Sequence, residues 1–104
     1  QAVCEGLAFG EALGLKPESL VPTLAAGAAG NWFIDKRGAT MLADNFMPGF
    51  KSALLLKDLH IVQAMADALG KHYSVVEQSL ADYQKLVDAG FGEEDTSALI
   101  RLKR

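Results

Sequence analysis

Residues 51–70, KSALLLKDLHIVQAMADALG, decide the fold of this chain. Their apolar side chains recur at the spacing of an α-helix, and Gly70 is a left-handed stop of the kind that ends many helices. His60, Gln63 and Asp67 fall on the opposite side from a broad apolar arc. At about 100° per residue, that arc collects Leu54, Leu55, Leu59, Ile61, Val62, Met65, Ala66, Ala68 and Leu69. We predict one helix of about five turns with this arc toward the core.

Asp58 does not fit the pattern, because the side chains three and four positions away are all leucine, isoleucine or valine. A carboxylate held against apolar surface is costly unless hydrogen-bond donors or a cation satisfy it. Two interpretations remain open at this point. Asp58 is either a structural carboxylate, bonded to amides of a neighbouring helix or paired with Arg37, or it faces a cleft. In the second case, Lys57 and Asp58 meet a ligand there.

Composition limits the function classes. The 104 residues are 50% hydrophobic with a net charge of −3, which fits one domain with a modest core. The acidic balance without a basic cluster argues against a nucleic-acid partner, and no apolar run approaches the roughly 20 residues that cross a membrane. The single cysteine, Cys4, excludes an internal disulfide and a cysteine-rich metal site. No secretory leader is evident, so we expect a cytoplasmic protein with no membrane partner.

The rest of the chain alternates helical segments with turns that contain glycine or proline. Asn31 is a candidate N-cap, Ser74–Glu77 matches a capping box, and Asp95 or Thr96 caps the last helix. Further helices are expected at residues 1–13, 17–26 and 32–43, from Ser74 to the glycine at 90, and at 97–100. No segment alternates like a strand. The predicted fold is all-α, a compact bundle of about six helices around one long central helix.

Two expectations concern packing. Gly6 and Gly10 each weaken the first helix, and we interpret them as places where another helix approaches closely. This helix begins without a capping residue or an initiator methionine. We therefore expect a piece of a longer protein, with an apolar face near Val3 and Leu7 left uncovered. We also expect bulky core side chains in the 32–43 helix, namely Trp32, Phe33, Met41 and Leu42.

Four motifs resemble the C-terminal domain of the β-hydroxyacid dehydrogenases, the group that includes 3-hydroxyisobutyrate dehydrogenase and tartronate semialdehyde reductase. The first resembles that family's helix rich in Glu, Ala and Leu, which leads to a Gly-Leu turn. In order, the motifs are EGLAFGEALGL at 5–15, FMPGF at 46–50, KDL at 57–59 and GFGEEDTSAL at 90–99. Together they cover nearly the whole chain.

The resemblance implies that residues 1–104 form a helical substrate and oligomerisation domain, with a fold like the C-terminal domain of 6-phosphogluconate dehydrogenase. It also implies an NAD(P)-dependent oxidoreductase in which an N-terminal Rossmann domain, absent here, binds NAD or NADP. That enzyme would transfer hydride between nicotinamide and a small 3-hydroxy acid or semialdehyde. By the same resemblance Lys57 approaches the cofactor, while Phe50 and Asp58 line the substrate pocket. A homo-oligomer is expected.

One departure limits these expectations. The family's catalytic lysine and its companion asparagine lie upstream of the matching region, so no catalytic residue is expected in this chain, which alone should be inactive. The rival hypothesis is a free-standing helical interaction or dimerisation module without catalytic activity. A GxGxxG loop after a strand, encoded upstream of Gln1, would favour the enzyme.

Overall fold

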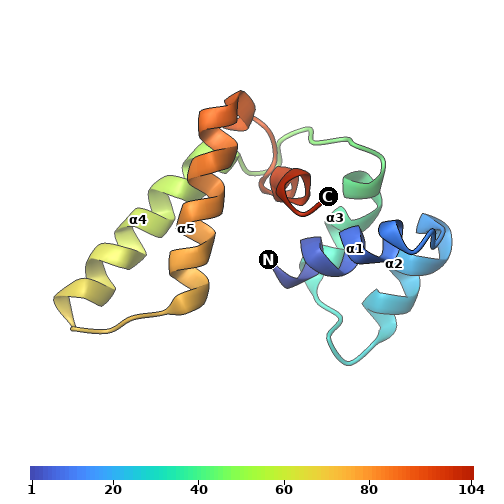
Figure 1. The fold of residues 1–104 in the computed structure, drawn as a ribbon, viewed down its shortest axis with the longest axis horizontal. Coiled ribbons are helices and arrows are strands. Elements are labelled where there is room, and N and C mark those ends of the chain that lie inside the picture. Colours follow the sequence, from blue (N-terminus) through green and yellow to red (C-terminus); the bar gives the residue numbers. More distant parts are fainter. The chain divides into compact units, whose positions relative to one another are not determined.

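The computed structural model describes residues 1–104, and nearly all of its regular structure is helical (Figure 1). Its elements in chain order are α1 (Ala2–Ala12), α2 (Pro17–Ala26), α3 (Trp32–Leu42), α4 (Ser52–Ala68), α5 (Ser74–Leu86), the π-helical turn η1 (Val87–Phe91) and the 3₁₀ helix η2 (Thr96–Leu102). Lys51 and Asp95 form an isolated antiparallel bridge. The predicted all-α class is therefore confirmed. No helix combines the length and the apolar character that crossing a bilayer requires.

Local sequence signals explain most helix ends. Pro17 occupies the first position of α2, where its missing N–H is tolerated. At α3, the backbone N–H of Ile34 donates to the side-chain oxygen of Asn31 over 3.1 Å, which confirms the predicted cap. Gly14 and Gly70 adopt positive φ angles of 73° and 62° just beyond α1 and α4. These are left-handed conformations that glycine adopts without a steric penalty.

The capping box predicted at Ser74–Glu77 is wrong. Ser74 is already the first residue of α5, and Tyr73 stands at the N-cap position without a side-chain hydrogen bond to the helix. A capping hydroxyl belongs to the residue before the first helical position, so Ser74 is one residue too far along the chain to cap α5. Glu77 instead lies 3.5 Å from a ring nitrogen of His72, just before the helix.

The chain divides into two compact units, a division that the sequence patterns did not predict. The first unit comprises residues 1–46 and 100–104, and the second comprises residues 47–99. In the first, α1, α2 and α3 pack against one another. Its core includes Cys4, whose thiol donates to the sulfur of Met41 over 3.8 Å. Burial raises the pKa of this thiol.

Within the first unit, two packing predictions hold and three fail. The side chain of Leu20 lies directly over Gly10, as the close-approach interpretation requires, but nothing lies within 4 Å of where a side chain would start at Gly6. Met41 is buried as predicted, whereas Trp32 is 64% exposed, with the guanidinium of Arg37 5.4 Å from its ring centre. Leu7 is fully buried and so is not part of the uncovered face expected there, whereas the ring of Phe9 on the same helix is 67% exposed.

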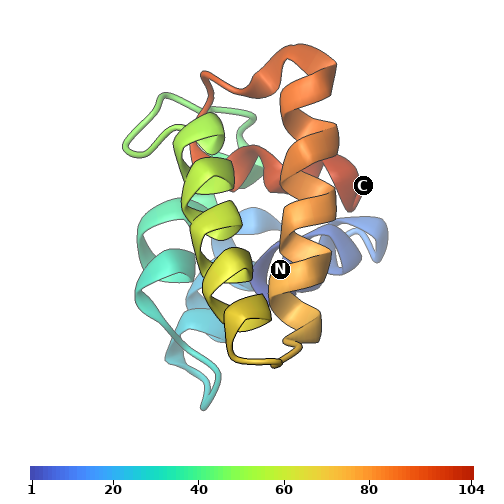
Figure 2. The same ribbon diagram turned by 90° about the vertical axis from the view of Figure 1, so that its left-hand side faces the viewer.

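In the second unit, α4 and α5 lie side by side and run in opposite directions (Figures 1 and 2). The face of α4 turned inward carries side chains four, three, four and three positions apart: Ser52, Leu56, Leu59, Gln63 and Ala66. The apolar arc predicted from periodicity is therefore rotated away from the observed face, and Gln63 lies on the packed side. Several members of the predicted arc remain exposed instead, among them Leu54, Ile61, Val62, Met65 and Leu69.

Candidate functional site

The start of α4 is held by a segment about 40 positions further along the chain. The first amides of any helix have no acceptor within the helix itself. Here the N–H of Ser52 donates to the carbonyl of Glu94, and the N–H of Ala53 donates to that of Gly92, both over 2.9 Å. Lys51 adds an ion pair with Glu93. The helix that carries the KDL motif is thus fixed at its first turn by the GFGEEDTSAL segment.

Asp95 lies at the centre of this arrangement and is almost fully buried. Its Oδ2 accepts hydrogen bonds from the backbone N–H groups of Gly49 and Phe50 over 2.9 and 3.2 Å. Its Oδ1 accepts from the N–H and the hydroxyl of Ser97 over 3.0 and 2.7 Å. Burial alone would raise the pKa of the Asp95 carboxyl, but the bonds from Ser97, Phe50 and Gly49 together outweigh it and lower the pKa.

Phe50 follows the Pro48–Gly49 bend and keeps 41% of its surface exposed. Both of its backbone groups are bonded, since its carbonyl also accepts from the N–H of Thr96 over 2.9 Å. Its main chain is therefore fixed while its ring is partly open to solvent. The wall of a pocket needs a fixed backbone and an accessible side chain. That Phe50 forms such a wall remains a prediction.

Lys57 and Asp58 form an ion pair with each other, with 2.7 Å between Nζ and Oδ1. Their side chains are 62% and 47% exposed, so Asp58 is not held against apolar surface as its sequence neighbours indicated. Arg37 was one possible partner of Asp58, and the structure pairs this carboxylate with the neighbouring Lys57. Exposed pairs of this kind contribute at most about 1 kcal/mol to stability. Both side chains are accordingly accessible to a ligand.

A shallow hollow of about 580 Å³ lies beside Lys57. Its other lining residues are Ala53, Leu56, His60, Ile61, Ala64 and Val87. Lys57 and His60, one helical turn apart, are the polar side chains at an otherwise apolar surface. Sequence reasoning placed His60 on a solvated face and missed this position, although its spacing of three from Lys57 indicates a shared side of the helix. The hollow suits a ligand with an anionic group next to an apolar part.

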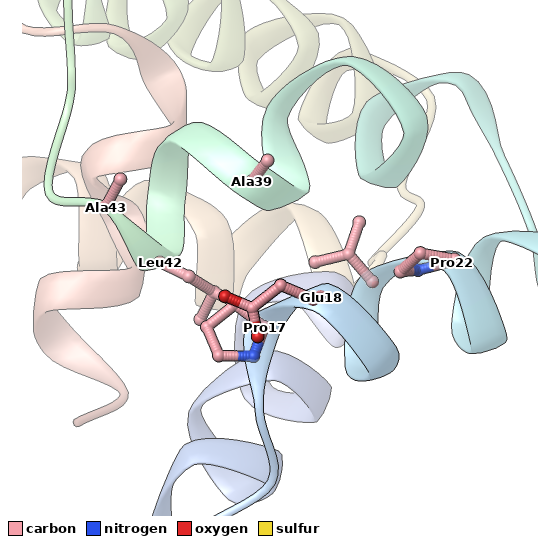
Figure 3. A pocket seen from close by; sticks show the side chains of 7 residues that line it. Pro17, Glu18, Pro22, Ala39, Leu42 and Ala43 are labelled. Carbon is pink, nitrogen blue, oxygen red and sulfur yellow. The ribbon is translucent and has the colours of Figure 1, made fainter.

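A second hollow, of about 520 Å³, belongs to the first unit (Figure 3). Its lining comes from α2 and the end of α3: Pro17, Glu18, Val21, Pro22, Ala39, Leu42 and Ala43. The only ionisable group among these is the carboxylate of Glu18. Because this surface offers no cation for an acidic ligand, the hollow beside Lys57 is the better candidate site.

Comparison with known proteins agrees with the motif order. A family model described as NAD-binding of NADP-dependent 3-hydroxyisobutyrate dehydrogenase matches residues 1–103. An uncharacterised oxidoreductase of Bacillus subtilis is 30% identical over 96% of this chain, and 2-hydroxy-3-oxopropionate reductase of Escherichia coli is 30% identical over 97%. In both cases the chain spans 35% of the relative's length.

A solved structure gives the same result. The 3-hydroxyisobutyrate dehydrogenase of Mycobacterium tuberculosis, crystallised with L-serine, superimposes with a TM-score of 0.87 at 25% identity. The match covers 99% of this chain and 38% of that one. Fold and sequence thus define a helical domain of the dehydrogenase class. The chain belongs to the 3-hydroxyisobutyrate dehydrogenase family.

Proposed function

We propose that this chain is the helical C-terminal domain of an NAD(P)-dependent oxidoreductase that acts on a small 3-hydroxy acid or the corresponding semialdehyde. The match of the family model to residues 1–103 carries the proposal. Since the chain spans about a third of its relatives' length, a preceding Rossmann domain would bind most of the dinucleotide. The same preceding part would supply the acid–base lysine.

The residues of the candidate site fit this role chemically. The ammonium of Lys57 is exposed at the edge of an apolar hollow and is paired only with a surface carboxylate, so it is free to turn toward an anionic or carbonyl oxygen. When bound, the nicotinamide would supply or accept the hydride. Lys57 would contribute positive charge near it, Asp58 would accept hydrogen bonds at the edge of the cleft, and Phe50 would wall the pocket.

The chemistry of a related enzyme's ligand also supports the proposed substrate class. The L-serine named with the Mycobacterium tuberculosis structure carries a hydroxyl group on the carbon next to the one that bears its carboxylate. A 3-hydroxy acid shares that arrangement of hydroxyl and carboxylate. The ammonium of Lys57 beside an apolar hollow suits the carboxylate of such a molecule, which supports the proposed substrate class.

Replacing Lys57 by alanine in the full-length protein tests the proposal. Loss of a charge-assisted hydrogen bond should lower kcat/KM for a 3-hydroxy acid about ten- to a hundred-fold. The melting temperature should barely change, because the ion pair is exposed. The matched control is Lys36→Ala, which removes another exposed lysine paired with its neighbour, Asp35, over 2.8 Å. Equal kinetics in the two variants would contradict the role of Lys57.

The same experiment addresses the rival hypothesis. An interaction module would show no dehydrogenase activity in the full-length protein with NAD or NADP, whichever hydroxy acid is supplied. Asp58→Ala adds a second criterion. If Asp58 serves the cleft, the variant should alter KM or kcat and leave the thermal unfolding of the 104-residue chain unchanged.

A further inference from the structure

The two oxygens of the Asp95 carboxylate bond to different parts of the second unit. Oδ1 accepts from Ser97, two positions along the chain, and so closes the first turn of η2. Oδ2 accepts from Gly49 and Phe50, which lie 46 and 45 positions away. The first pair of bonds is a helix cap. The second pair of bonds involves no residue of η2. It holds the turn that carries Phe50 in place.

The segment that bears Asp95 is well suited to act as a fixed support. Ser97, Ala98 and Leu99 are completely or almost completely buried. The hydroxyl of Tyr83 on α5 donates to the carbonyl of Thr96 over 2.7 Å, and the hydroxyl of Ser52 on α4 donates to the carbonyl of Asp95 over 3.2 Å. The backbone of Asp95 is thus tied to α4, and that of the next residue, Thr96, is tied to α5.

The turn itself lies largely at the surface. Pro48 has no backbone N–H to donate, Met47 is strongly exposed, and the ring of Phe50 is partly open to solvent. The backbone of Phe50 is held by Oδ2 of Asp95 at its N–H and by the N–H of Thr96 at its carbonyl. Without Oδ2, the amides of Gly49 and Phe50 lose their acceptor, and the turn can swing about the remaining bond.

We propose that Asp95 is a positioning residue for the substrate pocket, whose Oδ2 fixes the location of the Phe50 ring. This inference rests on the proposed function of Phe50 as a pocket wall. Asp95 itself touches neither substrate nor cofactor, and it acts through Phe50 alone. Its contribution to catalysis is therefore conditional on the aromatic ring being present.

A double-mutant cycle in the full-length enzyme tests this condition. Asp95→Ser retains an oxygen that can cap Ser97 but is too short to reach Gly49 and Phe50. Since small displacements of substrate-positioning groups are costly, we expect Asp95→Ser to lower kcat/KM about ten-fold. In the Phe50→Ala background the same change should cost less than about two-fold, because the two residues act as one unit. If Asp95→Ser does not fold, Asp95→Asn takes its place with the same expected non-additivity.

Ser97→Ala is the matched control, since it removes a donor to Oδ1 and leaves both bonds of Oδ2 intact. It should lower the melting temperature while kcat/KM stays within about two-fold. In the 104-residue chain, amide hydrogen exchange should accelerate at Gly49 and Phe50 in Asp95→Ser and not in Ser97→Ala. Unchanged exchange at these two amides in Asp95→Ser would overturn the inference.

The kinetic outcomes separate this inference from the proposed function. If Phe50→Ala lowers kcat/KM but Asp95→Ser costs the same in both backgrounds, the positioning role is refuted and the pocket wall stands. If Phe50→Ala leaves kcat/KM unchanged, the pocket-wall function fails and the inference fails with it. A cycle in which the Asp95 effect disappears with the Phe50 ring supports both.

Discussion

At Asp95, burial and hydrogen bonding act on one carboxyl group in opposite directions, and hydrogen bonding prevails. The pKa in the folded chain lies below its ordinary value of 3.8, so the ionised form is bound more tightly by the fold than the protonated form. Its contribution to stability is therefore complete above about pH 4 and is lost as the pH falls through the lowered pKa.

We expect this loss to be visible against Asp95→Asn, which cannot ionise. The difference in unfolding free energy between the two chains should be largest near neutral pH and should shrink below about pH 4. Urea titrations at a series of pH values would measure it. A difference that stays constant down to about pH 2.5 would contradict this account.

The same residue marks how far the sequence predicts the site. The cap that Asp95 provides to Ser97 is local, and the pattern Asp-Thr-Ser predicted it correctly. Its bonds to Gly49 and Phe50 were not predictable, because no local pattern identifies a partner 45 positions away. Asp58 shows the opposite case. Its neighbours along the helix left open a structural carboxylate and one that faces a cleft, and the structure shows it half exposed in an ion pair with Lys57.

At the scale of elements, helix ends were predicted better than helix faces. Ends depend on residues such as Asn31, Pro17 and Gly70, whose backbone preferences are local. The face of α4 depends on its neighbours in space. Apolar side chains surround most of this helix, so its periodicity alone does not select one side. The observed inner face includes the small buried residues Ser52 and Ala66, and α4 packs against α5.

The two glycines within α1 allow a paired test of packing. Alanine at position 6 meets open space and should stabilise the chain by about 0.5–1 kcal/mol through its higher helix propensity. Alanine at position 10 would place its Cβ 2.4 Å from a methyl group of Leu20. The displaced leucine should outweigh the propensity gain, for a net loss of about 1 kcal/mol.

Chemical denaturation of the 104-residue chain measures both changes, and each variant is the control for the other because they share one helix. Equal stabilisation by the two alanines would show that the contact between α1 and α2 tolerates a methyl group at position 10.

At the scale of the whole molecule, the apolar side chains left exposed on α4 concern assembly. Val62, Met65 and Leu69 are between 43% and 73% exposed, which is unusual for three large apolar residues at the end of one helix. We expect a further copy of the protein to cover them, in line with the predicted homo-oligomer. Val62→Glu should then weaken self-association at least about ten-fold, because it would bury an unpaired charge.

Sedimentation of the full-length protein over a range of concentrations would measure this effect. Gln78→Glu adds the same charge at an exposed polar position of α5 and should leave association unchanged. A wild-type protein that remains monomeric at high concentration would refute the assignment of this face.

The division of the chain into units has a consequence for its synthesis. Arg104 belongs to the first unit, where its guanidinium bonds both oxygens of Glu11 over 2.8 and 2.9 Å and also pairs with Asp44. The ribosome makes residues 47–99 before it reaches these last residues. The second unit therefore has all its contacts while the first still lacks part of its own. We expect nascent chains to acquire protease resistance in residues 47–99 before they acquire it in residues 1–46.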